Sequence, residues 1–215
     1  MPSVLLLRHS VLPLALALTA CAAPAVRDAG SINASARVCC SSVSDLPSPE
    51  PATKERAVQL TPLSPHFNFG LGVAPFVQMA LSPSTVGIEL RTHAKAGGAK
   101  LLGGDGTFHY ADVRLVFFDA TMKPLEATTL SPAKLETVGL AGRYMFVANV
   151  AVPPSATSVV VTTNPNSVGQ QSTATVRVSG GAAMVPGAIV PLPGGNATIP
   201  YTLSPYGEVT LITRP

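Results

Sequence analysis

The chain has 215 residues, of which 47% are hydrophobic and 12% are charged, and its formal net charge is +3. Its 21 Pro and 18 Gly argue against a coiled coil, a helical bundle or a doubly wound nucleotide-binding fold, because both residues break helices. The apolar content is too high for a chain that is disordered throughout. The basic residues are scattered singly, without the stripe typical of nucleic-acid-binding proteins, so we expect no nucleic-acid partner.

The first twenty residues have the pattern of a secretory signal peptide. Arg8 precedes an apolar run of 8 residues at 11–18, which is far shorter than the roughly 20 residues of a membrane-spanning helix. The segment ends LTAC, with its cysteine at Cys21, and this ending resembles the lipobox of bacterial lipoproteins. The resemblance implies cleavage before Cys21 and acylation of its thiol and new amino group, which would anchor the chain stably in a membrane.

Lipid attachment at Cys21 would place the protein in the periplasm of a Gram-negative bacterium, with a membrane as its first partner. Ala22 follows the cysteine, and by the same resemblance a residue other than Asp here permits sorting to the outer membrane. The alternative is a soluble secreted protein that is cleaved elsewhere, in which Cys21 is incidental. We expect the lipid-anchored form, with residues 1–20 as its signal peptide.

An extended tether is expected from residue 21 to residue 66. Residues 22–37 are rich in Ala, Ser, Asn and Gly and contain few large apolar residues, so they cannot offset the entropy cost of an ordered backbone. The following stretch is kept extended by spaced prolines, namely Pro47, Pro49, Pro51, Pro62 and Pro65.

Two adjacent cysteines, Cys39 and Cys40, lie within this tether. Consecutive Cα atoms are about 3.8 Å apart across a trans peptide, below the usual disulfide spacing of roughly 4.4–6.8 Å, so a bond between neighbours is strained. An oxidising compartment favours pairing, and acylation of Cys21 would leave an even pair. A disulfide between Cys39 and Cys40, two thiols and links to a second chain all stay open, whereas two cysteines without further nearby ligands do not make a metal site.

From residue 67 onward, period-two alternation and β-branched residues recur between turn signals, which predicts strands. The clearest is 111–119 (ADVRLVFFD), where both faces are apolar, as in a strand that is covered on both sides. Turns are expected at 119–124 and 164–166, and Ser131-Pro132 has the N-cap and first-position Pro of a short helical turn. The other expected strands are 73–80, 85–93, 125–130, 143–152, 155–163, 172–179, 198–203 and 207–213.

Short strands separated by Gly and Pro turns are typical of an antiparallel sandwich or barrel. We therefore predict an all-β fold in which residues 67–215 form an antiparallel β-sandwich of jelly-roll type. The signal peptide (1–20) and the tether (21–66) precede it.

Residues that could carry out chemistry are sparse. His66, His93 and His109 are separated by 27 and 16 residues, without the close pairing of metal ligands, so we predict no metal site. No nucleophile elbow, phosphate loop, dinucleotide fingerprint or zinc-protease motif occurs, and the acidic residues are too dispersed to nominate a glycosidase pair. We expect no enzymatic activity, no catalytic residue and no cofactor.

A Gly-rich loop at 103–106 (GGDG) could bring the backbone close to a ligand, with Asp105 or Asp112 accepting hydrogen bonds from hydroxyl groups. A hairpin loop in which Gly supplies positive φ and Asp caps the turn explains the same residues, and we expect that simpler role. Tyr201 or Tyr206, if exposed, could stack on a sugar ring, although such residues more often seal the end of a sandwich.

Four stretches resemble the maltose operon periplasmic protein family. They are VCCSSVSDLP near the start, DVRLVFFDATMKPLEA and RYMFVANVAVPPSATSVVVTTNP in the centre, and SPYGEV near the end. Together they span roughly 38–215, and their order is more specific than any one of them. The resemblance implies export, residence in the periplasm and association with maltose or maltodextrin uptake, and it supplies no catalytic residues. The adjacent cysteines and the lipobox depart from the longer members of the family.

The sequence thus predicts a periplasmic accessory lipoprotein that is associated with carbohydrate (maltose or maltodextrin) uptake or glycan binding and is not catalytic. The alternative is a structural outer-membrane or envelope lipoprotein that acts through contacts with proteins or the cell wall. The expected partners are a membrane, reached through the lipid, and a carbohydrate or an envelope protein. No ligand-binding residue is assigned from the sequence.

Overall fold

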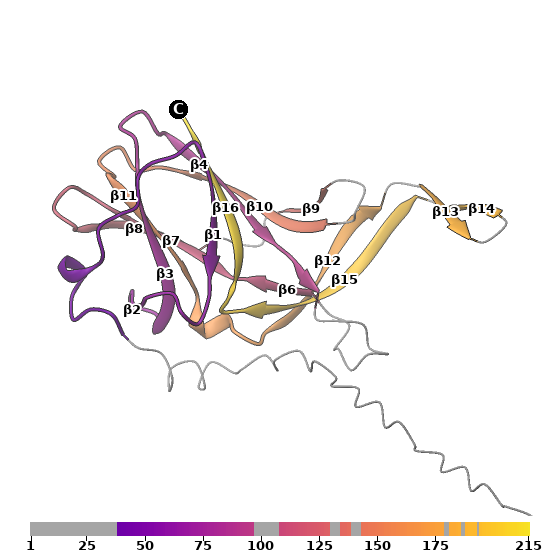
Figure 1. Cartoon of the computed structure of the whole chain (residues 1–215), viewed down its shortest axis with the longest axis horizontal. Coiled ribbons are helices and arrows are strands. Elements are labelled where there is room, and N and C mark those ends of the chain that lie inside the picture. The colour runs from indigo at the N-terminus through magenta and orange to yellow at the C-terminus, as the bar shows by residue number, and fades with distance from the viewer. Residues whose placement is uncertain are drawn as a thin grey trace, which may run out of the picture.

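The computed structural model describes residues 38–96, 108–129, 134–138, 143–178, 181–185, 188–192 and 194–215. Its regular structure is nearly all β (Figure 1). Two five-stranded sheets pack face to face, which confirms the predicted all-β sandwich.

We call the two sheets of the sandwich sheet I and sheet II. Sheet I contains, in spatial order, β1 (Glu55–Leu60), β16 (Gly207–Arg214), β4 (Gly87–His93), β10 (Arg143–Ala151) and β9 (Lys134–Val138). Sheet II contains β2 (His66–Asn68), β3 (Val73–Ala80), β11 (Ser158–Thr163), β7 (Val113–Phe118) and β8 (Pro124–Thr129). Neighbouring strands within both sheets are antiparallel.

Eight of these strands have the connectivity of a jelly roll. Numbered from one to eight in chain order, they are β1, β3, β4, β7, β8, β10, β11 and β16. They then lie in the order 1–8–3–6 in sheet I and 2–7–4–5 in sheet II. This order arises when a long antiparallel ribbon wraps onto itself, so that the first strand pairs with the last. Val58 of β1 accordingly lies opposite Val209 of β16.

The core lies between the two sheets, because one residue in two along each strand faces inward. Val58, Leu90 and Leu211 come from sheet I, and Leu115 and Phe117 come from sheet II. Each of these side chains is at most 3% exposed. Burial of an apolar side chain of this size contributes roughly 1.5–3 kcal/mol, so this layer is the main source of the sandwich's stability.

Four more strands are inserted between β11 and β16. β12 (Gln171–Val178) and β15 (Gly195–Ser204) form a long antiparallel hairpin that projects from the sandwich, and β13 (Gly181–Val185) and β14 (Ala188–Leu192) form a two-stranded ribbon at its far end (Figure 1). β15 also pairs in parallel with β6 (Phe108–Ala111), which in turn pairs with β5 (Lys95–Ala96). The insertion therefore extends the fold at the crossover between the last two strands of the jelly roll.

Both predicted turns are present. The Asp119 carboxylate accepts hydrogen bonds from the N–H groups of Thr121 (2.8 Å) and Lys123 (3.0 Å), which closes the turn between β7 and β8. The side chain of Asn164 accepts the N–H of Asn166 at 3.1 Å and starts the short 3-10 helix η3 (Pro165–Ser167). Asx turns of this kind are what the Asp and Asn positions in the sequence indicate.

The structure corrects two expectations. The segment assigned to the tether up to residue 66 contains β1, because Val58 and Leu60 of that strand lie in the core at 3% and 1% exposure. The prediction of a helical turn after Ser131-Pro132 is also wrong from Lys134 onward, because Lys134–Val138 forms strand β9, which pairs with β10. Residues 131–133 lie outside the described residues. Pairing with the distant strand β16 in the first case, and with the next strand β10 in the second, outweighs the local signal.

Candidate functional site

Residues 38–50, which we call the strap, precede the jelly roll and lie across the outer face of sheet II. At the start of the strap, the N–H of Cys39 donates to the carbonyl of His66 at 2.9 Å. At its end, the N–H of Glu50 donates to the carbonyl of Gln78 at 2.9 Å. Backbone hydrogen bonds thus pin both ends of the strap to β2 and β3, so this part of the expected tether belongs to the folded domain.

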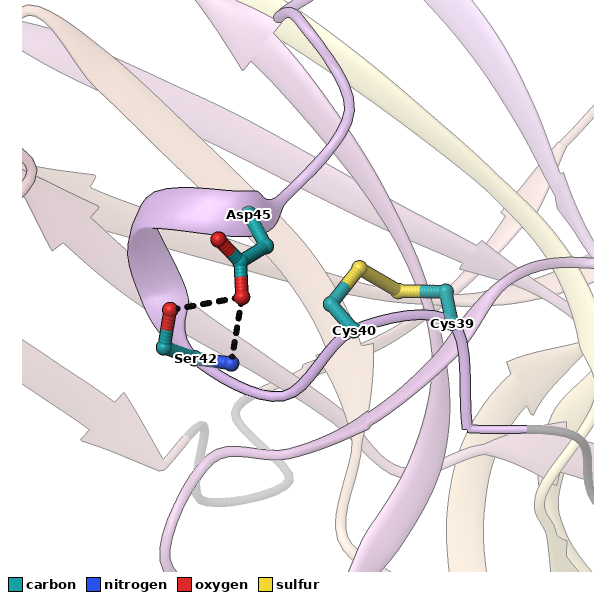
Figure 2. The surroundings of a disulfide bond; sticks show 4 residues. All are labelled: Cys39, Cys40, Ser42 and Asp45. Atoms are coloured by element: carbon teal, nitrogen blue, oxygen red, sulfur yellow. Dashed lines mark hydrogen bonds between the residues drawn. A yellow bond between two sulfur atoms is a disulfide. The ribbon is translucent and has the colours of Figure 1, made fainter.

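Cys39 and Cys40 form a disulfide between neighbours, with Cα atoms 3.8 Å apart (Figure 2). Cys39 is exposed, whereas Cys40 is half-buried. The short 3-10 helix η1 (Val43–Asp45) follows directly, and its first turn is closed by Ser42, whose N–H and hydroxyl donate to the Asp45 carboxylate at 3.1 and 2.8 Å (Figure 2). Of the three states that the sequence leaves open, the structure contains the disulfide.

This disulfide closes a ring that includes only two consecutive residues. A loop this short restricts the unfolded chain little, so the bond restrains the local backbone and does not join distant parts of the chain. Chemically, it can accept two electrons and two protons from a dithiol reductant and yield two thiols. The hydrogen bonds at the ends of the strap do not involve the sulfur atoms, so we expect them to persist after reduction.

A second, smaller apolar cluster lies under the strap on the outer face of sheet II. Phe76 and Phe118, both 1% exposed, are at its centre, together with Phe67, Val116 and Val160. The strap contributes Cys40, Val43 and Leu46 to this cluster. The rings meet edge to face, with Phe69 and Phe76 centroids 5.3 Å apart at 83°, which is a favoured aromatic geometry. The strap therefore covers apolar side chains that would otherwise face water.

An ion-pair cluster lies on the outer face of sheet I. Glu89 of β4 is only 7% exposed. Its carboxylate accepts a hydrogen bond from Arg91 Nε at 2.6 Å and another from the guanidinium of Arg214. The Arg214 hydrogen bond is the main cause that lowers the pKa of Glu89, ahead of the opposing effect of burial. Glu89 is therefore ionised at neutral pH and holds both guanidinium groups in place.

Further polar side chains continue this surface toward the edge of sheet I. His93 Nε2 and Thr210 Oγ1 are 3.0 Å apart, and Gln59 Nε2 donates to Glu208 Oε2 at 3.2 Å. We call the whole set the polar face, namely Gln59, Glu89, Arg91, His93, Glu208, Thr210 and Arg214. Cross-strand register places these residues on one side of the sheet, because Gln59 lies opposite Glu208 and Arg91 lies opposite Thr210. The polar face thus offers donors and acceptors that already hold one another in position.

The three candidate histidines lie on three different sheets. His93 belongs to the polar face, and His109 lies half-buried on β6. His66 on β2 is 2% exposed, and burial lowers its pKa against the smaller, opposing effect of a hydrogen bond to the Ser64 backbone. Among the residues that the structure describes, no three His, Cys, Asp or Glu side chains lie close enough together to hold a metal ion.

Asp112 has a local structural role. Its carboxylate accepts hydrogen bonds from the Ser167 hydroxyl and the Asn164 side chain, and its carbonyl accepts the Asn164 N–H at 2.9 Å. Burial raises the pKa of Asp112 more than these hydrogen bonds lower it. The carboxyl group therefore fastens η3 to the start of β7. Asp105 and the loop 103–106 lie outside the described residues.

The two candidate sugar-stacking tyrosines are not free platforms. Tyr201 is 5% exposed, and its ring packs edge-on against Tyr110 and Phe146, with centroids 5.5 and 5.1 Å away. Tyr206 is half-buried, and its backbone N–H donates to Ser204 Oγ at 3.2 Å in the turn before β16. Tyr201 therefore belongs to an aromatic core at the base of the inserted hairpin.

Sequence analysis missed both the strap and the polar face. One signal for the polar face is visible in β4, where Glu89 and Arg91 alternate with the buried Ile88 and Leu90. The second guanidinium of the cluster could not be found in this way, because Arg214 is 125 residues away from Glu89 in the chain.

Cys21 and the predicted signal peptide (1–20) lie outside the described residues. Within the described part of the chain, no helix has the length and apolar character needed to cross a membrane. No protein-family model, no curated protein and no solved structure matches this chain.

Proposed function

We propose that this protein is a non-catalytic accessory lipoprotein of the periplasm, anchored to the outer membrane through Cys21 and associated with maltose or maltodextrin uptake. The LTAC sequence at Cys21 supports the anchor. The four stretches that resemble the maltose operon periplasmic protein family support the compartment and the association with sugar uptake. In this proposal the protein binds a carbohydrate and does not convert it chemically.

The polar face is the observation that carries the binding role. Sugar hydroxyl groups both donate and accept hydrogen bonds, and the face supplies guanidinium donors beside carboxylate acceptors. Glu89 already orients Arg91 and Arg214, so less side-chain entropy is lost when a ligand binds. The strap covers part of the outer face of sheet II, whereas the Arg91 and Arg214 side chains of the polar face are 36% and 57% exposed, within reach of a ligand.

A titration of the full chain with maltodextrins tests this proposal. We expect saturable binding by the unmodified protein and about a tenfold loss of affinity in Arg91→Ala, which corresponds to about 1.4 kcal/mol. Lys123→Ala is the matched control, because it removes the same charge from the exposed turn between β7 and β8. Absence of a saturable response to any maltodextrin would overturn the sugar-binding role.

A structural envelope protein is the second candidate, and one observation favours it. At the centre of the polar face, Glu89 holds the guanidinium groups of Arg91 and Arg214 in position. Charged groups that are fixed in position suit a complementary protein surface equally well, because they set the specificity and the rate of docking. A photo-crosslinker at Gln59, introduced in cells, should then capture one envelope protein, and Arg91→Ala should abolish that adduct. Persistence of the same adduct in Arg91→Ala would contradict docking through this face.

A further inference from the structure

The disulfide between Cys39 and Cys40 contributes little to holding the fold together. Its ring contains only the two side chains and the peptide between them, so it shortens no long loop of the unfolded chain. The strap is held on sheet II by backbone hydrogen bonds of Cys39 and Glu50 and by apolar contacts with the cluster beneath it. The fold can therefore accommodate the pair in its oxidised and in its reduced state.

The two cysteines differ in burial. Cys39 is exposed, and so are Val38 before it and Ser41 after the pair. Cys40 is half-buried and packs against the apolar cluster on sheet II, as Val43 of η1 does. Figure 2 shows the two sulfur atoms on the loop that leads into η1. Because exchange requires a thiolate to reach one sulfur while the other leaves, the accessible target is the sulfur of Cys39 and the leaving group is Cys40.

We propose that the Cys39–Cys40 pair is a redox-exchange site, which a dithiol protein of the same compartment reduces through Cys39. The first thiolate of the partner attacks the Cys39 sulfur and forms a mixed disulfide. The bond between Cys39 and Cys40 breaks, and its electron pair leaves with Cys40 as a thiolate, which takes up a proton.

The second thiolate of the partner completes the exchange. It attacks the partner's own sulfur in the mixed disulfide, forms the partner's disulfide and releases Cys39 as a thiolate, which is protonated in turn. The partner has then lost two electrons and two protons, and the cysteine pair has gained them. This protein is the substrate of the reaction, and the exchange goes beyond the proposed carbohydrate binding without requiring the lipid at Cys21.

Reduction kinetics of the full chain test the proposal. Free thiols are first blocked with iodoacetamide, so that Cys21 does not contribute, and the reductant is thioredoxin kept reduced by its reductase. We expect the rate of reduction to about double when the thioredoxin concentration doubles, while circular dichroism shows that the chain stays folded. A rate that does not depend on the thioredoxin concentration would overturn the proposal, because reduction would then wait for unfolding.

A thioredoxin variant whose second active-site cysteine is replaced by serine traps the mixed disulfide. We expect the adduct on Cys39 and an alkylatable thiol on Cys40, identified by mass-spectrometric sequencing of the linked peptide. No adduct, or an adduct mainly on Cys40, would overturn the assignment of the attacked sulfur.

Val38 provides an apolar contact for a protein reductant beside the attacked sulfur, because it is 52% exposed. Val38→Ser should slow reduction by thioredoxin severalfold and leave reduction by dithiothreitol unchanged, since the small reductant needs no docking contact. Val86→Ser is the matched control, at a valine that is 63% exposed in the turn before β4, and should change neither rate. Equal thioredoxin rates in both variants, or slowing of Val38→Ser with both reductants, would contradict docking at Val38.

The state of the pair in cells tests whether the exchange occurs there. Acid quenching of a Gram-negative host followed by maleimide labelling measures the reduced fraction, and we expect that fraction to fall when the electron supply to the periplasmic dithiol proteins is removed. A pair that is fully oxidised with and without that supply would overturn the proposal. This experiment rests on the proposed periplasmic residence, which fractionation checks separately: a cytoplasmic chain would overturn the residence and leave the exchange with thioredoxin standing.

Discussion

The two outer faces of the sandwich differ, although both belong to the same jelly roll. The outer face of sheet II carries a cluster of aromatic and β-branched residues, and the strap, a segment of the same chain, packs against it. The outer face of sheet I instead carries an ion-pair cluster, in which Glu89 holds the partly exposed side chains of Arg91 and Arg214. The contrast shows how the same alternation of inward and outward residues gives one face that a chain segment covers and one that carries charged side chains.

The largest difference between the faces should be in stability. We expect Phe76→Ala, under the strap, to lower the free energy of unfolding by about 3–5 kcal/mol, because it leaves a cavity between sheet and strap. Ile212→Ala on the outer side of sheet I should cost less than about 1 kcal/mol. Urea unfolding of the two variants measures both values. Equal losses would mean that the strap does not form a second core.

Glu89→Gln should have the next largest effect. It removes the charge that pairs with Arg91 and Arg214, and hydrogen bonds to charged groups contribute about 1.5–3 kcal/mol. The matched variant Glu208→Gln, at an exposed position, should change stability by less than about 0.5 kcal/mol. Thermal unfolding of both variants at pH 7 provides the comparison.

The pH dependence of Glu89 gives an independent check. Because the folded protein lowers its pKa below 4.5, its contribution is complete above that pH and is lost as the pH falls toward the folded value. The difference in stability between the wild type and Glu89→Gln should therefore shrink on acidification. A difference that stays constant from pH 7 to pH 3 would show that the ion pairs are not its source.

His66, which lies beside the first anchor of the strap, should make stability fall in mild acid. Its pKa in the folded protein is below the ordinary value of 6.5, so the neutral ring is favoured by folding, and stability declines as the pH falls below about 6.5. His66→Asn should flatten this dependence between pH 7 and pH 5, measured as the melting temperature. The backbone hydrogen bond from Cys39 is kept in that variant. A wild-type curve that is already flat in this range would contradict the effect of burial.

Reduction of the disulfide should have the smallest effect on the strapped face. Because the ring includes only Cys39 and Cys40, its loss should lower stability by about 1 kcal/mol. Unfolding of the double variant Cys39→Ser/Cys40→Ser measures this value. A loss as large as that of Phe76→Ala would mean that the sulfur bridge itself holds the strap on the sheet.

The strands of the jelly roll could be predicted from the sequence because their signal is local. Segment 111–119 is apolar on both faces, and the structure places β7 between the main core and the cluster under the strap. The segment 143–152, in which apolar residues alternate along the chain, likewise contains β10. Turn residues such as Asp119 also act within five positions of the chain.

The strap and the ion-pair cluster could not be predicted in the same way. Prolines in 47–65 indicate an extended chain, but the hydrogen bond from Glu50 to Gln78 depends on an edge that forms only in the folded sheet. Arg214 meets Glu89 only after the last strand has paired with β4. A feature formed by residues far apart in the sequence can be recognised only after the strand order is known.

The most direct test of the proposed function is metabolic labelling with radioactive palmitate in a Gram-negative host, followed by fractionation of the membranes. We predict that the wild-type chain is labelled and co-sediments with the outer membrane, and that Cys21→Ala loses both the label and the membrane association. Palmitate incorporation that is unchanged in Cys21→Ala, or a wild-type chain without label, would contradict the lipid-anchored accessory protein described here.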